Sequence, residues 1–189
     1  HSQYAFWLRG LIPLQWTETK CQHELVTHHS GNADVSGRVE VADGFVDGSG
    51  SMPDPRLRRC GWSAVWFKPS SDSQGFPHGA GAMYGNVPDD SQTIPFAELY
   101  AILRLLQSTQ GSIRIWSDCW YTVDGFRRQR WLQCVCKHWE LWQRICIECE
   151  CRQVNVFWIK AHVLAKHLLS GQVSQFNAFG NAVADLLAK

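Results

Sequence analysis

The order of strand-like and helix-like runs is the feature that most constrains how this chain can fold. Three runs rich in apolar and β-branched residues come first, joined by turn residues, and helix-like and strand-like runs then alternate. The expected strands lie at 38–49, 61–67, 79–87, 112–118 and 154–160, and the expected helices at 95–108, 119–126, 131–150 and in a closing run after a loop at 161–176. This order predicts an α/β fold with one five-stranded mixed sheet, three strands antiparallel and two parallel, flanked by helices.

Residues 1–38 do not follow this pattern. They combine an apolar start with a polar stretch, THHSGNADVSG, that is typical of a linker. We therefore expect an N-terminal tail or linker at 1–38 and one domain at 39–189. Because the sequence begins with His1 rather than methionine, the tail could be the remnant of an upstream domain in a longer polypeptide.

Charge and hydropathy exclude two classes of protein. Eighteen Lys and Arg against 17 Asp and Glu give a formal net charge of +1, which excludes a strongly basic, histone-like binder and leaves nucleic-acid contacts to a local patch. No apolar run approaches the roughly 20 residues that cross a bilayer. The apolar start is interrupted by Arg9 and lacks the basic segment of a signal peptide. We expect no membrane partner and an intracellular location, in the cytoplasm or nucleus.

The eight cysteines allow two interpretations. A chain of 189 residues can fold without a disulfide framework, so we expect free thiols in a reducing compartment. The CxC and CxxCxC spacings within 134–151, with His138 nearby, could alternatively hold zinc. Apolar residues at spacings of three and four through 131–149 favour one side of a packed helix instead.

Four acidic residues lie where strands end or within helices. Asp47 ends the first expected strand, Glu98 lies in the first turn of a helix, Asp118 ends the fourth strand, and Asp185 lies in the closing helix. Mg²⁺ prefers oxygen ligands, and converging carboxylates would repel one another unless cations lay between them. Each residue alone could equally be a turn residue, a first-turn charge, a helix cap or a surface charge.

The closing helix places Asn181 and Asp185 four residues apart on one face. We expect the opposite face to be the buried one. Its apolar residues are Phe179, Val183, Leu186 and Leu187. Asp185 would then be directed away from the core.

These segments, taken in order, resemble the ribonuclease H family in its type 1 form, which has four catalytic carboxylates. FVDGS and GWSAVWF resemble the first hairpin, TIPFAELYAIL the glutamate-bearing helix, and WSDCWYTVDGF the passage from strand to helix. ELWQR, VFWIKAH and GNAVADLLAK resemble a later helix, the last strand with its histidine loop, and the closing helix. Any one motif is unspecific, but six in the family's order over residues 40–189 are specific.

The resemblance implies a ribonuclease H-like fold and an endoribonuclease that cleaves the RNA strand of RNA–DNA hybrids, leaving 5′-phosphate and 3′-hydroxyl ends. It implies two Mg²⁺ ions, for which Mn²⁺ can substitute. Asp47 would bridge them, Glu98 and Asp118 would complete one metal site, and Asp185 the other. One ion would activate a water and the other stabilise the leaving 3′-oxygen. His162 matches the mobile-loop histidine that assists proton transfer or product release; without the resemblance it would be an ordinary loop histidine.

The resemblance also implies several substrate contacts. Asn181 matches a position that binds substrate near the cut, and Thr93 resembles a contact to a DNA phosphate. Gly48 and Ser49 could meet the 2′-hydroxyl groups of the RNA through their backbone groups. The expected patch for the nucleic-acid backbone consists of Arg127, Arg128, Arg130 and Lys137, although this run could equally be a solvated helix junction.

The sequence departs from the family at the turn before Glu98. Ile94, Pro95 and Phe96 stand where polar residues and an arginine are usual, which puts the usual contacts from this turn in doubt. Asp43 is a rival for the first carboxylate. Asp47 is preferred because Gly-Ser and a Gly-Trp strand follow it.

Three other functions stay open at this point. The chain could be a catalytically weak module that binds nucleic acid within a retroelement reverse transcriptase polyprotein, an integrase or transposase with three carboxylates, or a zinc-stabilised interaction domain. We expect a monomer that binds RNA–DNA hybrid beside an upstream reverse transcriptase domain in the same polypeptide. This origin would be a retroelement of the non-LTR type, and a free-standing cellular enzyme is the alternative.

Overall fold

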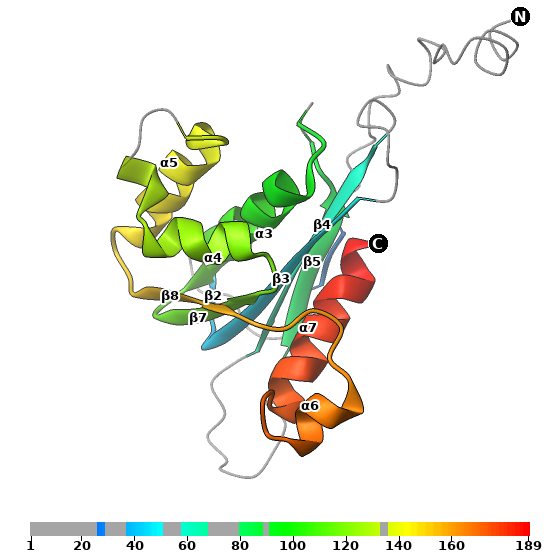
Figure 1. The fold of residues 1–189 in the computed structure, drawn as a ribbon. Helices are drawn as coiled ribbons and strands as arrows, with labels where there is room; N and C mark the ends of the chain where they lie inside the picture. The colour runs from blue at the N-terminus through cyan, green and yellow to red at the C-terminus, as the bar shows by residue number, and fades with distance from the viewer. Residues whose placement is uncertain (1–25, 29–36, 51–57, 68–79, 89–90, 133–135) are drawn as a thin grey trace, which may run out of the picture.

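The main sheet has six strands in the order β1–β5–β4–β3–β7–β8 (Figure 1). The structure is a computed structural model that describes residues 26–28, 37–50, 58–67, 80–88, 91–132 and 136–189. The six strands are β1 (Val26–His28), β3 (Asp43–Gly50), β4 (Cys60–Phe67), β5 (Ala80–Asn86), β7 (Ile113–Ser117) and β8 (Val154–Trp158). A small parallel sheet joins β2 (Val39–Glu40) to β6 (Thr109–Gln110).

The strand pairing confirms the expected mixed sheet. β3 is antiparallel to β4, and β4 to β5, whereas β3, β7 and β8 run parallel. β1 adds a further strand, antiparallel to β5, from within the expected tail. Its β-branched Val26 and Thr27 suit a strand. Residues 1–25 and 29–36 of that tail lie outside the described residues, so the domain boundary at 38 stays a prediction.

Helices cover both faces of the sheet, and β3 lies between them. On one side are α3 (Ile94–Ser108), α4 (Trp120–Arg127) and α5 (Trp139–Cys149), and on the other is α7 (Gln175–Ala188), which follows the short α6 (Ala165–Leu169) (Figure 1). Consecutive residues of β3 show the two layers, because Gly44 lies against Leu105 of α3 and Phe45 against Gly180 of α7. The two helices therefore pack on opposite faces of β3. No helix within the described ranges is long and apolar enough to cross a membrane.

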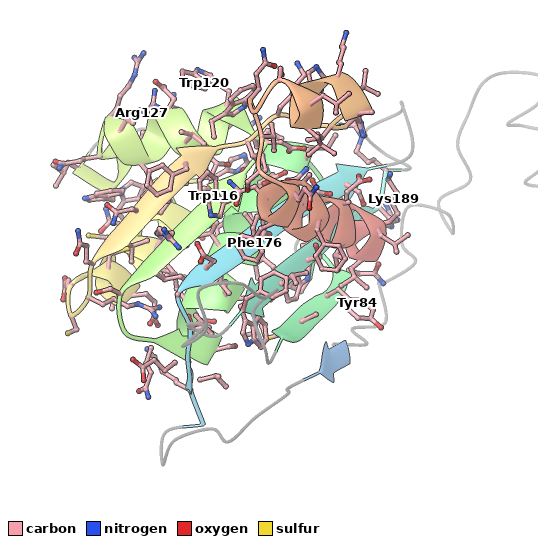
Figure 2. All side chains as sticks on the ribbon, turned by 90° about the horizontal axis from the view of Figure 1, so that it is seen from below. Tyr84, Trp116, Trp120, Arg127, Phe176 and Lys189 are labelled. Carbon is pink, nitrogen blue, oxygen red and sulfur yellow. The ribbon has the colours of Figure 1, made fainter. Side chains whose placement is uncertain are left out.

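The buried face of α7 differs from the predicted one. Phe179 and Leu186 are 49% and 72% exposed, whereas the buried positions are Gly180, Asn181, Ala184 and Ala188. Small residues allow the helix to lie close to the sheet: a Cβ added to Gly180 would come within 2.4 Å of the Phe45 ring. Partly buried Val183 and Leu187 pack at the margin of this contact. The large residues of α7 therefore lie on either side of the face that contacts the sheet. The Phe176 side chain, at the start of α7, points toward the strands and packs on Phe45 (Figure 2).

The prediction of a single helix over 131–150 is wrong. The structure has a 3₁₀ turn at Arg130–Leu132, a left-handed residue at His138 (φ 62°), and then α5. Trp131 packs on Trp142 with ring centroids 6.2 Å apart, and the Gln143 amide donates to the Trp131 carbonyl. Eleven residues of continuous helix would span about 16 Å, so the chain must fold back to make this contact. The expected loop at 161–176 also contains α6.

Because α7 packs so closely on the sheet, we predict that replacing its buried glycine by alanine destabilises the protein, although alanine is the better helix former. Glycine to alanine inside a helix ordinarily stabilises by about 1 kcal/mol. Gly180→Ala should instead lower the free energy of unfolding by about 1–2 kcal/mol, because overpacking outweighs that gain. The measurement is urea denaturation, with Ala182→Gly at an exposed position of the same helix as the matched control. A more stable Gly180→Ala protein would contradict the close approach.

Candidate active site

Asp47 lies in the second half of β3, whose two faces are covered by α3 and α7. It is 6% exposed and pairs with Ser63 of β4 in the sheet register. Asp43, the rival candidate, lies four residues earlier and binds Arg114 at 2.7 Å and the Trp116 indole N–H at 3.3 Å. The structure thus gives Asp43 a structural role and leaves Asp47 among the other carboxylates.

Glu98 is held by two hydrogen bonds and is 1% exposed. The Gly48 backbone N–H donates to Oε1 at 3.0 Å, and the Ser117 hydroxyl donates to Oε2 at 3.1 Å. Gly48 makes the first bond possible, because a Cβ there would lie 2.7 Å from the backbone nitrogen of Glu98. Glu98 thereby connects α3 to both β3 and β7.

Asp118 follows β7 directly and precedes α4. The Cys119 N–H donates to the Ser117 hydroxyl at 3.1 Å, and the Trp158 indole donates to the Asp118 carbonyl at 3.2 Å, which fixes the turn from both sides. One carboxylate oxygen from each of Asp47, Glu98 and Asp118 lies within 4.8 Å of the others. The structure therefore brings together three of the four predicted carboxylates.

Burial and mutual repulsion disfavour the charged forms of these three groups. Burial, and then the charges of Asp118 and Asp185, raise the pKa of Asp47 to about 7. Burial, and then Asp47 and Asp118, raise the pKa of Glu98 well above its ordinary value. Burial also raises the pKa of Asp118, although a hydrogen bond from Asn181 opposes the shift. A bound cation would lower the free-energy cost of ionising these three buried carboxylates.

Asp185 lies beside this group without joining its closest contacts. Its charge raises the pKa values of Asp47 and Asp118, so it lies within electrostatic range of both. Its Oδ2 accepts from the Lys189 ammonium at 2.7 Å, one helical turn further along α7. Asp185 is therefore paired with a cation that belongs to the chain itself.

Asn181 is the buried polar residue of α7 that faces the carboxylates. It is 5% exposed, its amide donates to Asp118, and its Oδ1 has no hydrogen-bond partner. A buried unpaired carbonyl costs about 1–3 kcal/mol unless a ligand or water satisfies it. Together with the all-oxygen donor set of Asp47, Glu98 and Asp118, this orphaned atom fits a site that takes divalent metal ions and a polar ligand.

His162 lies on the loop after β8. It is exposed, has a left-handed backbone with φ of 48°, and lies close enough that its charge lowers the pKa of Asp118. The loop therefore holds this imidazole at the margin of the carboxylate cluster, and its catalytic role stays a prediction.

Three further predicted positions use their polar groups inside the protein. The Thr93 hydroxyl caps α3 by accepting from the Phe96 N–H at 3.4 Å, and the Ser49 hydroxyl donates to the Ala188 carbonyl. The Gly48 N–H is bonded to Glu98. Their assignment as substrate contacts stays a prediction.

The predicted basic patch is partly neutralised. Arg128 and Arg130 both bind Asp124, at 2.9 and 3.4 Å, whereas the Arg127 guanidinium lies 5.1 Å from the centre of the Trp120 ring. Trp120 is exposed, and it lies with Arg127 on α4 (Figure 2). Residues 127–130 thus form a helix junction, in which the Arg127 guanidinium lies over the exposed Trp120 ring.

Sequence reasoning missed Ser117 as a functional position. Ile113, Ile115 and Ser117 alternate along β7 and share the face that packs toward α3, where all three are buried. A polar residue on an otherwise apolar buried face needs a hydrogen-bond partner, and that signal was present in the sequence.

The cysteines within the described residues form no comparable site. The described cysteines at 60, 119, 136, 146, 149 and 151 are all free thiols. Burial raises the pKa of Cys149 to about 11, so this thiol is not poised to ionise. Among the described residues, the only group of three or more potential ligands is the carboxylate cluster. Cys21 and Cys134 lie outside the described residues.

The raised pKa of Asp47 predicts a pH-dependent gain from removing its charge. Between pH 3.8 and about 7 the folded state binds more protons at Asp47 than the unfolded state, so the stability of the metal-free protein falls as pH rises. In metal-free buffer at pH 8, Asp47→Asn should raise the free energy of unfolding by about 1–3 kcal/mol, and the gain should vanish near pH 4.

Urea denaturation with EDTA measures this gain, with Glu150→Gln at an exposed position as the control. Added Mg²⁺ should stabilise the parent protein more than Asp47→Asn, because only the parent keeps the full ligand set. A gain that does not change with pH would contradict the assigned cause.

Comparison with known proteins agrees with this geometry. The model of the family described as RNase H matches residues 39–189, and no curated protein matches the sequence. Two RNase H proteins are among the solved structures that resemble the fold. LC9-RNase H1, a type 1 RNase H with the type 2 active-site motif, is 16% identical over 79% of this chain and 72% of its own, with a TM-score of 0.58. The RNase H domain of PFV is 20% identical over 80% of this chain and 93% of its own, with a TM-score of 0.57. Since the family match spans most of the sequence, this chain belongs to the RNase H family.

Proposed function

We propose that this chain is an endoribonuclease that cleaves the RNA strand of RNA–DNA hybrids by metal-dependent hydrolysis, leaving 5′-phosphate and 3′-hydroxyl ends. The observation that carries the proposal is the convergence of Asp47, Glu98 and Asp118 within 4.8 Å in a chain of the RNase H family. Buried carboxylates that raise one another's pKa are typical of sites that hold cations for catalysis.

Asp47, Glu98, Asp118 and Asp185 would hold two Mg²⁺ ions, with Mn²⁺ as a substitute. When bound, such ions activate a water for in-line attack and stabilise the leaving 3′-oxygen. The protein's own contribution is to fix the ligands before substrate arrives, since Gly48 and Ser117 each hold one oxygen of Glu98. Preorganisation of this kind avoids rearrangement during the reaction.

Two side chains at the margin of the cluster are suited to act on the substrate. The free Oδ1 of Asn181 can accept a hydrogen bond from a 2′-hydroxyl, which only the RNA strand carries. His162 is exposed beside Asp118 and can carry a proton to the departing oxygen or assist product release.

The surface around the cluster is more apolar than the family pattern implies. Ile94, at the start of α3, and Trp120, at the start of α4, are both exposed large apolar side chains. We assign them to the sugar face of the minor groove, where shape and van der Waals contact replace hydrogen bonds. Arg127 over Trp120 adds a cation for a nearby phosphate.

A second candidate is a module that binds hybrid but cuts it weakly. It is favoured by the Lys189 ammonium on Asp185, because this cation occupies Oδ2 and competes with a metal ion for the carboxylate. A third solved structure resembles the fold, a foamy viral protease-reverse transcriptase in complex with dsDNA, at 15% identity over 79% of this chain and 94% of its own, with a TM-score of 0.51. Both candidates are compatible with an upstream reverse transcriptase domain in a retroelement polypeptide and with a monomeric nuclease domain.

Cleavage of an end-labelled RNA–DNA hybrid tests the proposal. We expect Mg²⁺- or Mn²⁺-dependent cutting of the hybrid alone, with RNA–RNA and DNA–DNA duplexes left intact. Asp118→Asn should lower the rate by at least about 10²-fold, because it removes a metal ligand. Hybrid binding without cutting by the parent protein would favour the binding module, and equal rates for parent and variant would remove Asp118 from the site.

The role of Ser117 has a separate test. Ser117→Ala leaves Glu98 Oε2 without its donor, so kcat should fall by about 10-fold while hybrid affinity changes little. Thr109→Val is the matched control, since it also removes a buried hydroxyl, one that donates to the Leu105 carbonyl at 2.7 Å at the far end of α3. Equal kcat values for the two variants would show that Ser117 acts on stability alone.

A further inference from the structure

His167 is a buried polar side chain in the largely exposed segment between β8 and α7. It is 8% exposed, whereas the residues on either side, Lys166 and Leu168, are exposed. The segment carries His162 near its start and joins α7, which carries Asn181 and Asp185. Its conformation therefore sets how the histidine lies relative to the carboxylates.

Hydrogen bonds from both sides of the segment converge on His167. The ring Nδ1 accepts from the Leu164 N–H at 3.0 Å, and the backbone N–H of His167 donates to the Leu164 carbonyl at 2.9 Å. Its carbonyl accepts from the N–H groups of Gln172 and Val173, at 3.1 and 3.4 Å, and from the Ser170 hydroxyl at 3.2 Å. One residue thus connects the turn after His162 to the turn before α7.

The imidazole replaces the acidic or amide side chain of a capping box. In that motif the third residue of a helix reaches back to the N–H of the N-cap residue, a role that glutamate or glutamine usually fills. Here Leu164 is the N-cap of α6 and His167 is the third residue. The arrangement requires a neutral imidazole with its proton on Nε2, because a protonated Nδ1 cannot accept.

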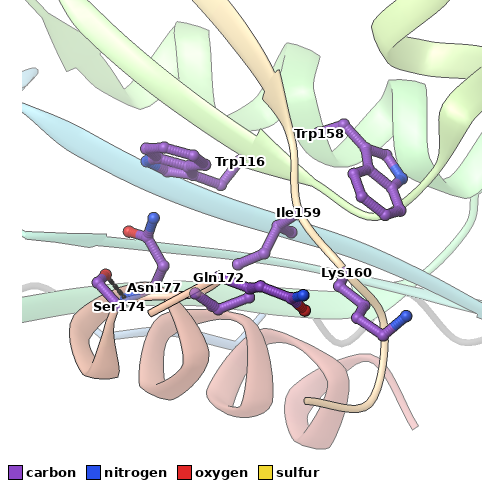
Figure 3. A pocket seen from close by; sticks show the side chains of 8 residues that line it. Trp116, Trp158, Ile159, Lys160, Gln172, Ser174 and Asn177 are labelled. Atoms are coloured by element: carbon purple, nitrogen blue, oxygen red, sulfur yellow. Dashed lines mark hydrogen bonds between the residues drawn. The ribbon is translucent and has the colours of Figure 1, made fainter. Parts of the chain in front are cut away.

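The charges around His167 favour this neutral form. Burial, and then the ammonium groups of Lys160 and Lys166, lower the pKa of His167. Lys160 and Gln172 also line a cavity of about 480 Å³ between the end of β8 and the start of α7 (Figure 3). Gln172 and Val173, whose N–H groups donate to the His167 carbonyl, form the wall of that cavity next to α7.

We propose that His167 is a positioning residue, which fixes the loop that presents His162 to the carboxylate cluster through a hydrogen bond accepted at Nδ1. The inference rests on the proposed nuclease function for the role of His162, but the hydrogen bond itself does not. Loss of the bond would leave the segment folded at its α7 end and free to move at its His162 end. The turnover step would then suffer more than hybrid binding.

A set of three substitutions separates the acceptor from the bulk of the side chain. In His167→Asn the amide oxygen can occupy the position of Nδ1, in His167→Gln it falls nearer Nε2, and His167→Ala has no acceptor. We expect His167→Gln and His167→Ala to lower kcat by about 10- to 100-fold with little change in KM, and His167→Asn to keep most of the parent activity. Leu169→Ala, at an exposed neighbouring position, is the control.

Nuclear magnetic resonance supplies a readout that does not depend on cleavage. The ¹⁵N shifts of the ring should show a neutral imidazole protonated on Nε2. The Leu164 amide should be protected from exchange in the parent and His167→Asn proteins and unprotected in the other two. A proton on Nδ1, or equal protection and kcat in all three variants, would overturn the proposal. A parent protein that shows these signals but cuts no hybrid would overturn the nuclease function and leave the hydrogen bond established.

Discussion

The site depends on a buried carboxylate shared by three segments. Glu98 belongs to α3, accepts from the backbone of β3 through Gly48, and accepts from the side chain of β7 through Ser117. Because the group is almost fully buried, leaving either oxygen without a donor would be costly. These two bonds fix α3 against the sheet at the point where Asp47 and Asp118 emerge, so the fold and the catalytic geometry share one constraint.

The same arrangement works against the stability of the metal-free protein. Asp47 and Asp118 raise the pKa of Glu98, Asp118 raises that of Asp47, and Asp185 raises those of Asp47 and Asp118. The chain partly compensates with donors of its own, namely the Asn181 amide toward Asp118 and the Lys189 ammonium toward Asp185. Neither replaces a divalent cation within the group, so the metal binding that we propose would follow directly from how the helices pack.

Sequence patterns predicted the elements that depend on local periodicity and missed those that depend on contacts. Asp47, Glu98 and Asp118 were predicted because the sequence pattern put each at a strand end or in a first helical turn, although Asp47 lies within β3 and Glu98 is the fifth residue of α3. The break at His138 could not, because it depends on Trp131 folding back onto Trp142. The prediction for the buried face of α7 was wrong because it selected the most hydrophobic side chains. The helix lies too close to the sheet for large side chains, so the small residues Gly180 and Ala184 occupy the contact. The His167 hydrogen bonds likewise depend on a turn whose geometry no periodicity encodes.

The contribution of both helical layers to one site has a consequence during synthesis. Asp47, Glu98 and Asp118 leave the ribosome well before α7, which supplies Asn181 and Asp185 and packs on β3 and β4 only once its own residues have been made. A nascent chain that ends before α7 thus has an incomplete ligand set and an uncovered sheet. The proposed activity would therefore begin only once α7 has docked on β3 and β4.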